Sequence, residues 1–167
     1  MQRGRLGARR RLLAEEALFI VQQARAALDS AGFPLALEVK LVAPTILKPV
    51  SPGPSPNPKI DPLCVETLDE IPYAIENVQV GFHLLEVPIP TMVLRTTGAG
   101  PNLFLREALI DELAHRAGLN PYLYRRKLLE KNAGNERLLA VLDLVAEKSA
   151  FSTAAKEGRF LGLACGF

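Results

Sequence analysis

Two stretches of the chain alternate between apolar and polar side chains, which is the pattern of a β-strand with one buried face. Residues 34–43 (PLALEVKLVA) place leucines and a valine on one side, with Glu38 and Lys40 on the other. Residues 78–87 (VQVGFHLLEV) form the second stretch, and Pro88 ends it. We expect the two strands to pair antiparallel in one sheet.

Four other stretches repeat apolar residues at the spacing of an α-helix. They cover residues 9–28, 103–117, 121–131 and 135–149. The first is expected to stop at the turn that begins with Asp29, and Asn120 and Asn135 are expected to cap the last two. In the 103–117 helix, the residues expected to be buried against the sheet are Leu105, Leu109, Leu113 and Phe104.

Residues 48–62 hold six prolines in fifteen positions, within a Pro-rich loop that extends over residues 46–70. Proline removes backbone donors, so an extended surface loop is expected there, with a PxxP ligand for a partner domain as the alternative. The strands on either side are expected to share a sheet, so the loop is not a domain boundary. The sequence therefore predicts an α+β fold: a small antiparallel sheet with helices packed on one side. Residues 1–167 would form a single partial domain, with an N-terminal helix within residues 1–30.

Composition and charge narrow the function classes. The chain is 49% hydrophobic, which is enough for a core, and its net charge of +2 is too small to indicate a nucleic-acid partner. The basic start is followed by Glu15 and Glu16, so it does not resemble a secretory signal, and no apolar run is long enough to span a membrane. A cytoplasmic location is expected, with the periplasm as the alternative for a full-length parent.

The sequence gives no indication of a metal site made of cysteine and histidine. Cys64 and Cys165 form no CxxC pair, and His83 and His115 are isolated from each other. Two free or buried thiols are expected.

The stretch RTTGAGPNLFLREALIDELAHRAGLN, residues 95–120, combines a Gly-rich turn with an amphipathic helix. Glycine lets a backbone approach a ligand closely, and a helix N-terminus favours anions. The alternative is that Gly98 to Pro101 form an ordinary turn before a helix that Asn102 caps. The residues alone leave both interpretations open.

Five pieces in sequence order resemble the molybdopterin-binding subunit of the xanthine dehydrogenase/aldehyde oxidase family, most closely the isoquinoline 1-oxidoreductase beta subunit branch. The resemblance covers roughly residues 25–167. The pieces are AALDSAGFPLALEVKLVAPTIL, EIPYAIENVQVGFHLLEVPIP, LRTTGAGPNLFLREALIDELAHRAGLNPYLYRRKLL, ERLLAVLDLVAEKSAF and GRFLGLACGF. They carry a Y-x-I-x-N strand, an R-x-x-G turn, an E-x-x-x-D-E-L-A helix and an N-P-x-x-Y-R helix.

The resemblance implies a molybdopterin-type molybdenum cofactor and the hydroxylation of an aldehyde or N-heterocycle with water as oxygen source. It also implies an iron–sulfur small subunit and the remaining large-subunit segments as partners. The residues that it assigns to cofactor binding are Arg95, Thr96, Gly98 and Asn102. The sequence departs from the family at two neighbouring positions, where Leu94 replaces a tryptophan and Pro101 a glutamine.

Two family segments have no clear counterpart here. The Gly-Gly-Phe-Gly loop is matched only by the weak candidate at residues 4–10, and the G-x-G-E-x-P segment with the catalytic glutamate has no match. We therefore assign no catalytic residue. Glu107 and Asp111 stand one helical turn apart, as a catalytic carboxylate pair could, but a solvated or capping role is favoured.

The expected function is that of a fragment of a molybdenum hydroxylase large subunit, inactive alone. The alternative is a non-enzymatic remnant or a small interaction module without cofactor. Residues 159–167 (RFLGLACGF) are expected to begin a strand whose unpaired edge causes self-association.

Overall fold

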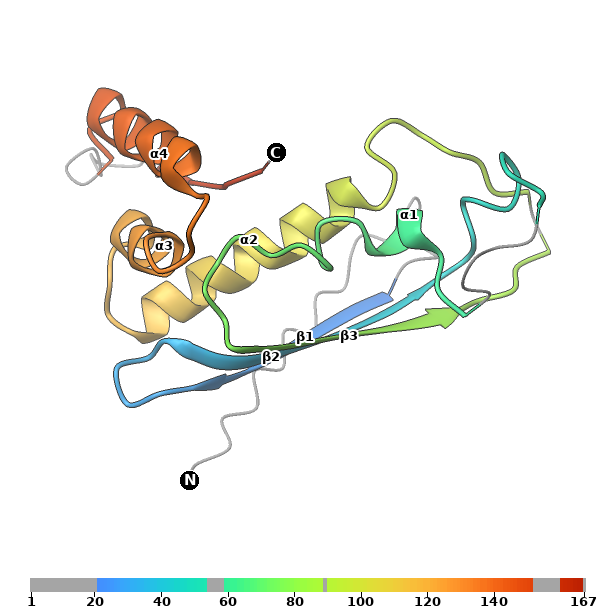
Figure 1. Cartoon of the computed structure of the whole chain (residues 1–167), viewed down its shortest axis with the longest axis horizontal. Helices are drawn as coiled ribbons and strands as arrows, with labels where there is room; N and C mark the ends of the chain where they lie inside the picture. Colours follow the sequence, from blue (N-terminus) through green and yellow to red (C-terminus); the bar gives the residue numbers. More distant parts are fainter. Residues whose placement is uncertain (1–20, 54–58, 89, 152–159, 167) are drawn as a thin grey trace.

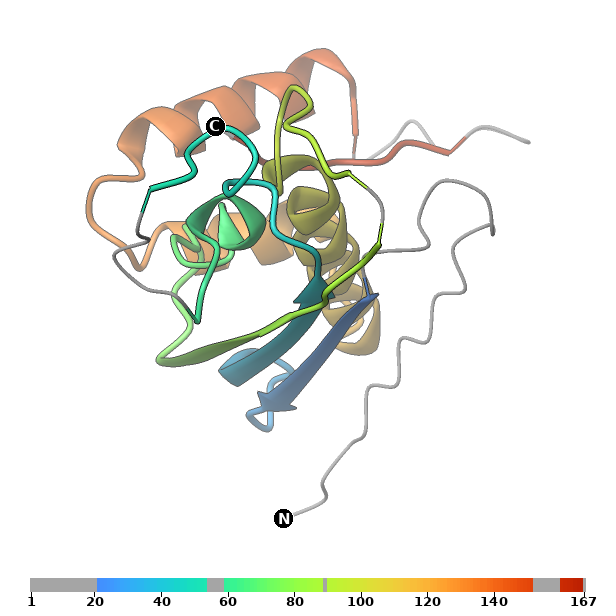
Figure 2. The same cartoon turned by 90° about the vertical axis from the view of Figure 1, so that its right-hand side faces the viewer.

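The computed structural model describes residues 21–53, 59–88, 90–151 and 160–166. In this part of the chain, a three-stranded sheet with the order β1-β2-β3 carries helices on one of its faces (Figures 1 and 2). The predicted α+β class, with helices on one side of a small sheet, is confirmed.

The first two strands form a hairpin. β1 (Val21–Leu28) pairs antiparallel with β2 (Pro34–Ala43), and the Asp29 carboxylate accepts the backbone N–H groups of Ala31 and Phe33 in the turn between them. The prediction for β2 is confirmed over its full range.

The helix predicted over residues 9–28 is wrong for residues 21–28, which form β1, while residues 9–20 lie outside the described residues. The sequence VQQARAAL fits the period of a helix and that of a strand, because Ala24 and Leu28 satisfy the four-residue spacing of a helix and also the two-residue alternation of a strand. Pairing with β2 decides between them, since it places Ala24, Ala26 and Leu28 against the core.

β3 (Asn77–Leu84) joins the same sheet beside β2, as predicted, but the two strands are parallel. The predicted antiparallel pairing is therefore wrong. The chain leaves β2 and returns through a long crossover that includes the short helix α1 (Pro62–Val65), so β3 starts again at the end where β2 started (Figure 1). Parallel neighbours need such a crossover.

Three helices follow: α2 (Ala99–Arg116), α3 (Pro121–Leu129) and α4 (Glu136–Lys148). They match the predicted segments, with α2 starting four residues earlier than the predicted 103. The Asn120 side chain accepts the Tyr122 N–H, which confirms the predicted cap of α3. Asn135 occupies the N-cap position of α4, but its side-chain oxygen accepts no capping bond, so the predicted cap is wrong; its side-chain amide donates to the carbonyls of Pro72 and Leu129.

The core lies between the sheet and the helices. On α2, Leu109 and Leu113 are buried and Leu105 is half-buried, as predicted, whereas Phe104 is 51% exposed and its predicted burial is wrong. Other members of the core come from the sheet and from α3, among them Leu37, Val39, Tyr124, Leu128 and Leu129. Both cysteines are buried free thiols, as predicted.

The C-terminal segment forms no strand over residues 160–166, so the predicted strand at 159–167 is wrong for its described part. Leu161 is exposed and Leu163 half-buried, while Cys165 is buried and bound by polar groups of α2. No helix in the described ranges is long and apolar enough to cross a membrane.

Candidate functional site

The turn before α2 is fastened to α1 and the residues that follow it. Gly98 N–H donates to the Leu63 carbonyl at 2.9 Å, and the Thr97 hydroxyl donates to the Glu66 carboxylate. These bonds fix the start of α2 on a part of the chain more than thirty residues away in sequence. The position of the turn is therefore set by the fold.

Gly98 is required for this contact. A Cβ atom at Gly98 would lie 2.3 Å from the Leu63 carbonyl oxygen and 2.7 Å from that of Cys64. Both are backbone atoms, so no side chain could turn aside to make room. The close approach that the sequence predicted for this glycine is thus an approach to the backbone of α1.

Asn102 is buried in the first turns of α2, so it is not the cap of that helix; Gly98 occupies the N-cap position. The Asn102 side-chain amide donates to the carbonyls of Cys64 and Glu66, both at 2.8 Å. Its oxygen accepts from the Gln22 side chain on β1. Asn102 therefore links three elements of the fold: α2, the end of α1, and β1.

The residues just before Gly98 have an unusual conformation. Thr96 and Thr97 have φ angles of 73° and 41°, in the left-handed region that β-branched residues rarely adopt. Each such residue costs on the order of 1–2 kcal/mol, and strain of this kind is found most often at functional sites. The bonds of Thr97, Gly98 and Asn102 to the neighbouring segment hold the strained backbone in place.

Arg95 stands at the exposed end of this turn. Its guanidinium has no hydrogen-bond or ion-pair partner among the described residues. Two large apolar side chains beside it are also exposed, Met92 by 82% and Leu94 by 80%. A cation that has no partner among the described residues and stands next to exposed apolar groups is suited to an anionic ligand or a covering segment.

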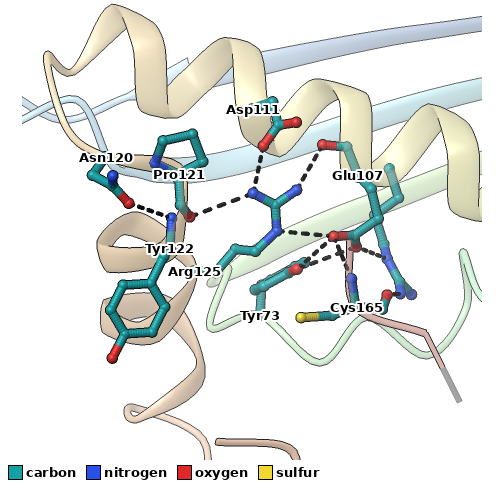
Figure 3. A network of polar contacts seen from close by, with 9 residues as sticks. Tyr73, Glu107, Asp111, Asn120, Pro121, Tyr122, Arg125 and Cys165 are labelled. Atoms are coloured by element: carbon teal, nitrogen blue, oxygen red, sulfur yellow. Dashed lines mark hydrogen bonds and ion pairs between the residues drawn. The ribbon is translucent and has the colours of Figure 1, made fainter. Parts of the chain in front are cut away.

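Sequence reasoning missed a second polar cluster, which is buried and centred on Glu107 of α2. The Glu107 carboxylate accepts from the Tyr73 hydroxyl at 2.9 Å, from Arg106 Nε and Arg125 Nε at 3.0 Å each, and from the Cys165 backbone N–H at 3.0 Å (Figure 3). Glu107 is only 5% exposed. The predicted solvated or capping role is therefore wrong, and its four donors make Glu107 the centre of a buried network.

Two buried arginines balance the charge of this network. Arg125 is 0% exposed and binds Glu107, Asp111 and the Glu107 carbonyl, while Arg106, 3% exposed, also donates to the carbonyls of Thr67 and Cys165. Burial alone would lower the pKa of Arg125, but the neighbouring carboxylates of Asp111 and Glu107 raise the pKa above its ordinary value, so the group stays charged. Two cations face two carboxylates, so the network is neutral.

The network keeps its other members in their neutral forms. Burial, followed by the charge of Glu107, raises the pKa of the Tyr73 hydroxyl far above its usual range. The same two causes raise the pKa of the Cys165 thiol. Tyr73 therefore remains a hydrogen-bond donor, and neither group is activated as a nucleophile or base at neutral pH.

The four residues that the resemblance assigns to cofactor binding thus lie together at one end of α2. They divide into two kinds. Arg95 and Thr96 face solvent, while Gly98 and Asn102 are engaged inside the chain. The fit to an anionic cofactor therefore rests on Arg95 and on the turn itself. In the described part of the chain, no three His, Cys, Asp or Glu side chains are grouped so that they could hold a metal ion.

Comparison with known proteins supports the fold. Neither a protein-family model nor a curated protein sequence matches the chain. Among solved structures, the chain is similar to an aldehyde oxidoreductase from Desulfovibrio gigas, with a TM-score of 0.58 and 21% sequence identity. The similarity covers 84% of this chain but only 16% of that one. The chain therefore has a fold like that of one part of an aldehyde oxidoreductase.

Proposed function

We propose that this chain is a fragment of a molybdenum hydroxylase large subunit and contributes part of a molybdopterin site. The observation that carries the proposal is Arg95, an exposed guanidinium without a partner in the described residues, mounted on a strained turn fixed to the fold. The fold similarity to an aldehyde oxidoreductase supports the same conclusion.

In this proposal the four residues have different roles. Arg95 would hold an anionic group of the cofactor through its planar fork of donors, with Thr96 beside it. Gly98 and Asn102 would act indirectly, because their bonds set the position from which Arg95 reaches out. When bound, a cofactor of this type would supply the hydroxylation chemistry that the family resemblance implies.

We propose no catalytic residue in this chain. Of the three carboxylates of α2, Glu107 and Asp111 are the two that stand one helical turn apart as a catalytic pair could, and both are paired with Arg125. The proposed partners are an iron–sulfur small subunit and the remaining segments of the large subunit. The chain alone should not oxidise aldehydes or N-heterocycles, and dye-linked oxidation by the pure chain, lost on adding cyanide, would contradict this.

The experiment compares Arg95→Ala with Arg116→Ala after expression in cells that make molybdenum cofactor. Arg116 is a matched control, because it is an exposed arginine at the opposite end of α2. Metal analysis of the purified proteins should find molybdenum with the unaltered chain and with Arg116→Ala, and a loss of most of it with Arg95→Ala.

Two results would count against the proposal. Equal molybdenum in both variants would remove Arg95 from the site. Absence of molybdenum from a folded, unaltered chain would favour the alternative, a non-enzymatic remnant or an interaction module that uses the Pro-rich loop.

A further inference from the structure

The outer edge of β3 has no strand paired with it in the described part of the chain. β3 is the last strand of the sheet, and none of the described residues hydrogen-bonds to the side of β3 that faces away from β2. The Leu85 N–H donates to the Ala43 carbonyl on β2. Since backbone groups alternate sides along a strand, the residues whose N–H and C=O point outward are Val78, Val80, Phe82 and Leu84.

This edge carries none of the usual protection against pairing with another strand. Natural edges are guarded by charges, prolines or bulges. β3 (NVQVGFHL) contains no proline and no Lys, Arg, Asp or Glu, and its register with β2 is continuous. β1, the opposite edge, carries Arg25 and a register shift between Ala27 and Leu28. The two edges are therefore not equivalent.

The same residues, whose backbone N–H and C=O groups point away from β2, place their side chains on the face of the sheet that packs against the core. Val78, Val80 and Phe82 stand beside the core residues Leu37, Val39 and Leu41 of β2. Val78 is 44% and Leu84 is 39% exposed, so the apolar layer extends past the helices to the strand edge. An added strand with apolar residues in the same positions would continue this layer.

We propose that β3 pairs antiparallel with β3 of a second copy of this chain. In the register that uses all four outward residues of both copies, Val80 lies opposite Phe82 and Val78 opposite Leu84. The twofold axis then passes beside Gly81. Val78 and Leu84, the two exposed apolar residues of β3, are then covered by the second copy. Each copy pairs with an uncharged strand of the same sequence.

This register predicts a specific cross-link. Gly81 of one copy lies opposite Gly81 of the other copy, as a non-hydrogen-bonded pair. The Cα atoms of such a pair lie about 4.5 Å apart, within the range of about 4.4–6.8 Å that a disulfide spans. A side chain fits at Gly81, since a Cβ there would lie 3.8 Å from the nearest atom, an ordinary contact. Both native cysteines are buried, which keeps background cross-linking low.

The test compares Gly81→Cys with Gln79→Cys under mild oxidation. Residue 79 of one copy and residue 79 of the other would be offset by four residues along the paired strands. This separates them by about 14 Å, which is too far for a disulfide. Gly81→Cys should become mostly dimer on a non-reducing gel, while Gln79→Cys, on the same face of the sheet, should stay monomeric. Equal cross-linking of both, or of neither, would overturn the register.

A second variant tests the dimer without a cross-link. The Val78 N–H points outward, so Val78→Pro blocks the edge without removing a bond to β2, and proline is tolerated on such edges. Sedimentation should give the mass of two chains for the unaltered protein and of one chain for Val78→Pro, with unchanged circular dichroism. An unaltered chain that sediments as a monomer at high micromolar concentration would overturn the proposal.

Discussion

Replacing Glu107 by glutamine should be among the most destabilising conservative changes in this chain. The substitution keeps the shape but removes the charge that faces Arg106 and Arg125, which are 3% and 0% exposed. Its new amide group would also donate toward groups that are themselves donors, including the Cys165 N–H. Removing one partner of a buried ion pair costs about 3–5 kcal/mol. A domain has about 5–15 kcal/mol in total, so a large part of the stability should be lost.

The measurement is urea unfolding followed by circular dichroism. With a denaturant slope of about 2 kcal/mol per molar, the midpoint should fall by roughly 2 M. Glu112→Gln is the matched control, because Glu112 lies on the same helix, is exposed and has no ion-pair partner among the described residues; it should change stability by less than about 0.5 kcal/mol. If Glu107→Gln unfolds at the same midpoint as Glu112→Gln, the network does not hold the fold together as argued.

Three further predictions concern Asp61, Gly98 and Cys64. Asp61 accepts four hydrogen bonds that outweigh its burial and lower its pKa, so Asp61→Asn should cost about 1–3 kcal/mol at pH 7 in urea unfolding. This difference should shrink as the pH falls below about 4, because the stabilising charge is present only above that range. Gly98→Ala should lower the thermal midpoint markedly, because its Cβ would meet backbone atoms, and Gly100→Ala should lower it less, because its Cβ would meet only the side chain of Thr96. Burial, followed by the charge of Asp61, raises the pKa of Cys64 to about 12, so a thiol reagent at pH 8 should label it only after unfolding.

The pattern of side chains predicts elements better than it predicts their partners. β2 is found at its observed bounds, because its alternation is regular and prolines stand at both ends. The sequence of β1 predicts a helix, because its alanines and leucine satisfy both the helical and the strand period and only the hairpin partner decides between them. The parallel direction of β3 follows from the path of the crossover, which local sequence does not encode.

The buried network shows the same limit at the level of single residues. Glu107 lies three and seven residues before Ile110 and Ala114, so it falls on a buried stripe of α2. That spacing is a signal that the charge is buried, but nothing in the helix itself indicates Arg125, eighteen residues away, as the partner. Arg95 and Gly98 indicate the turn at residues 95–98 in the sequence, whereas the left-handed threonines and the contact of Gly98 with α1 depend on tertiary packing.

The arrangement at the start of α2 suggests why a strained turn is kept beside an exposed arginine. The bonds of Gly98 and Asn102 to the segment around α1 account for the position of α2, and the bond from Thr97 to Glu66 holds one of the two left-handed threonines before it. None of these bonds gives Arg95 a partner. A turn selected only to start a helix would relieve the strain with glycine at these positions. Under the proposed function this cost has an explanation, because a turn held on a fixed base would present Arg95 outward to an anionic group.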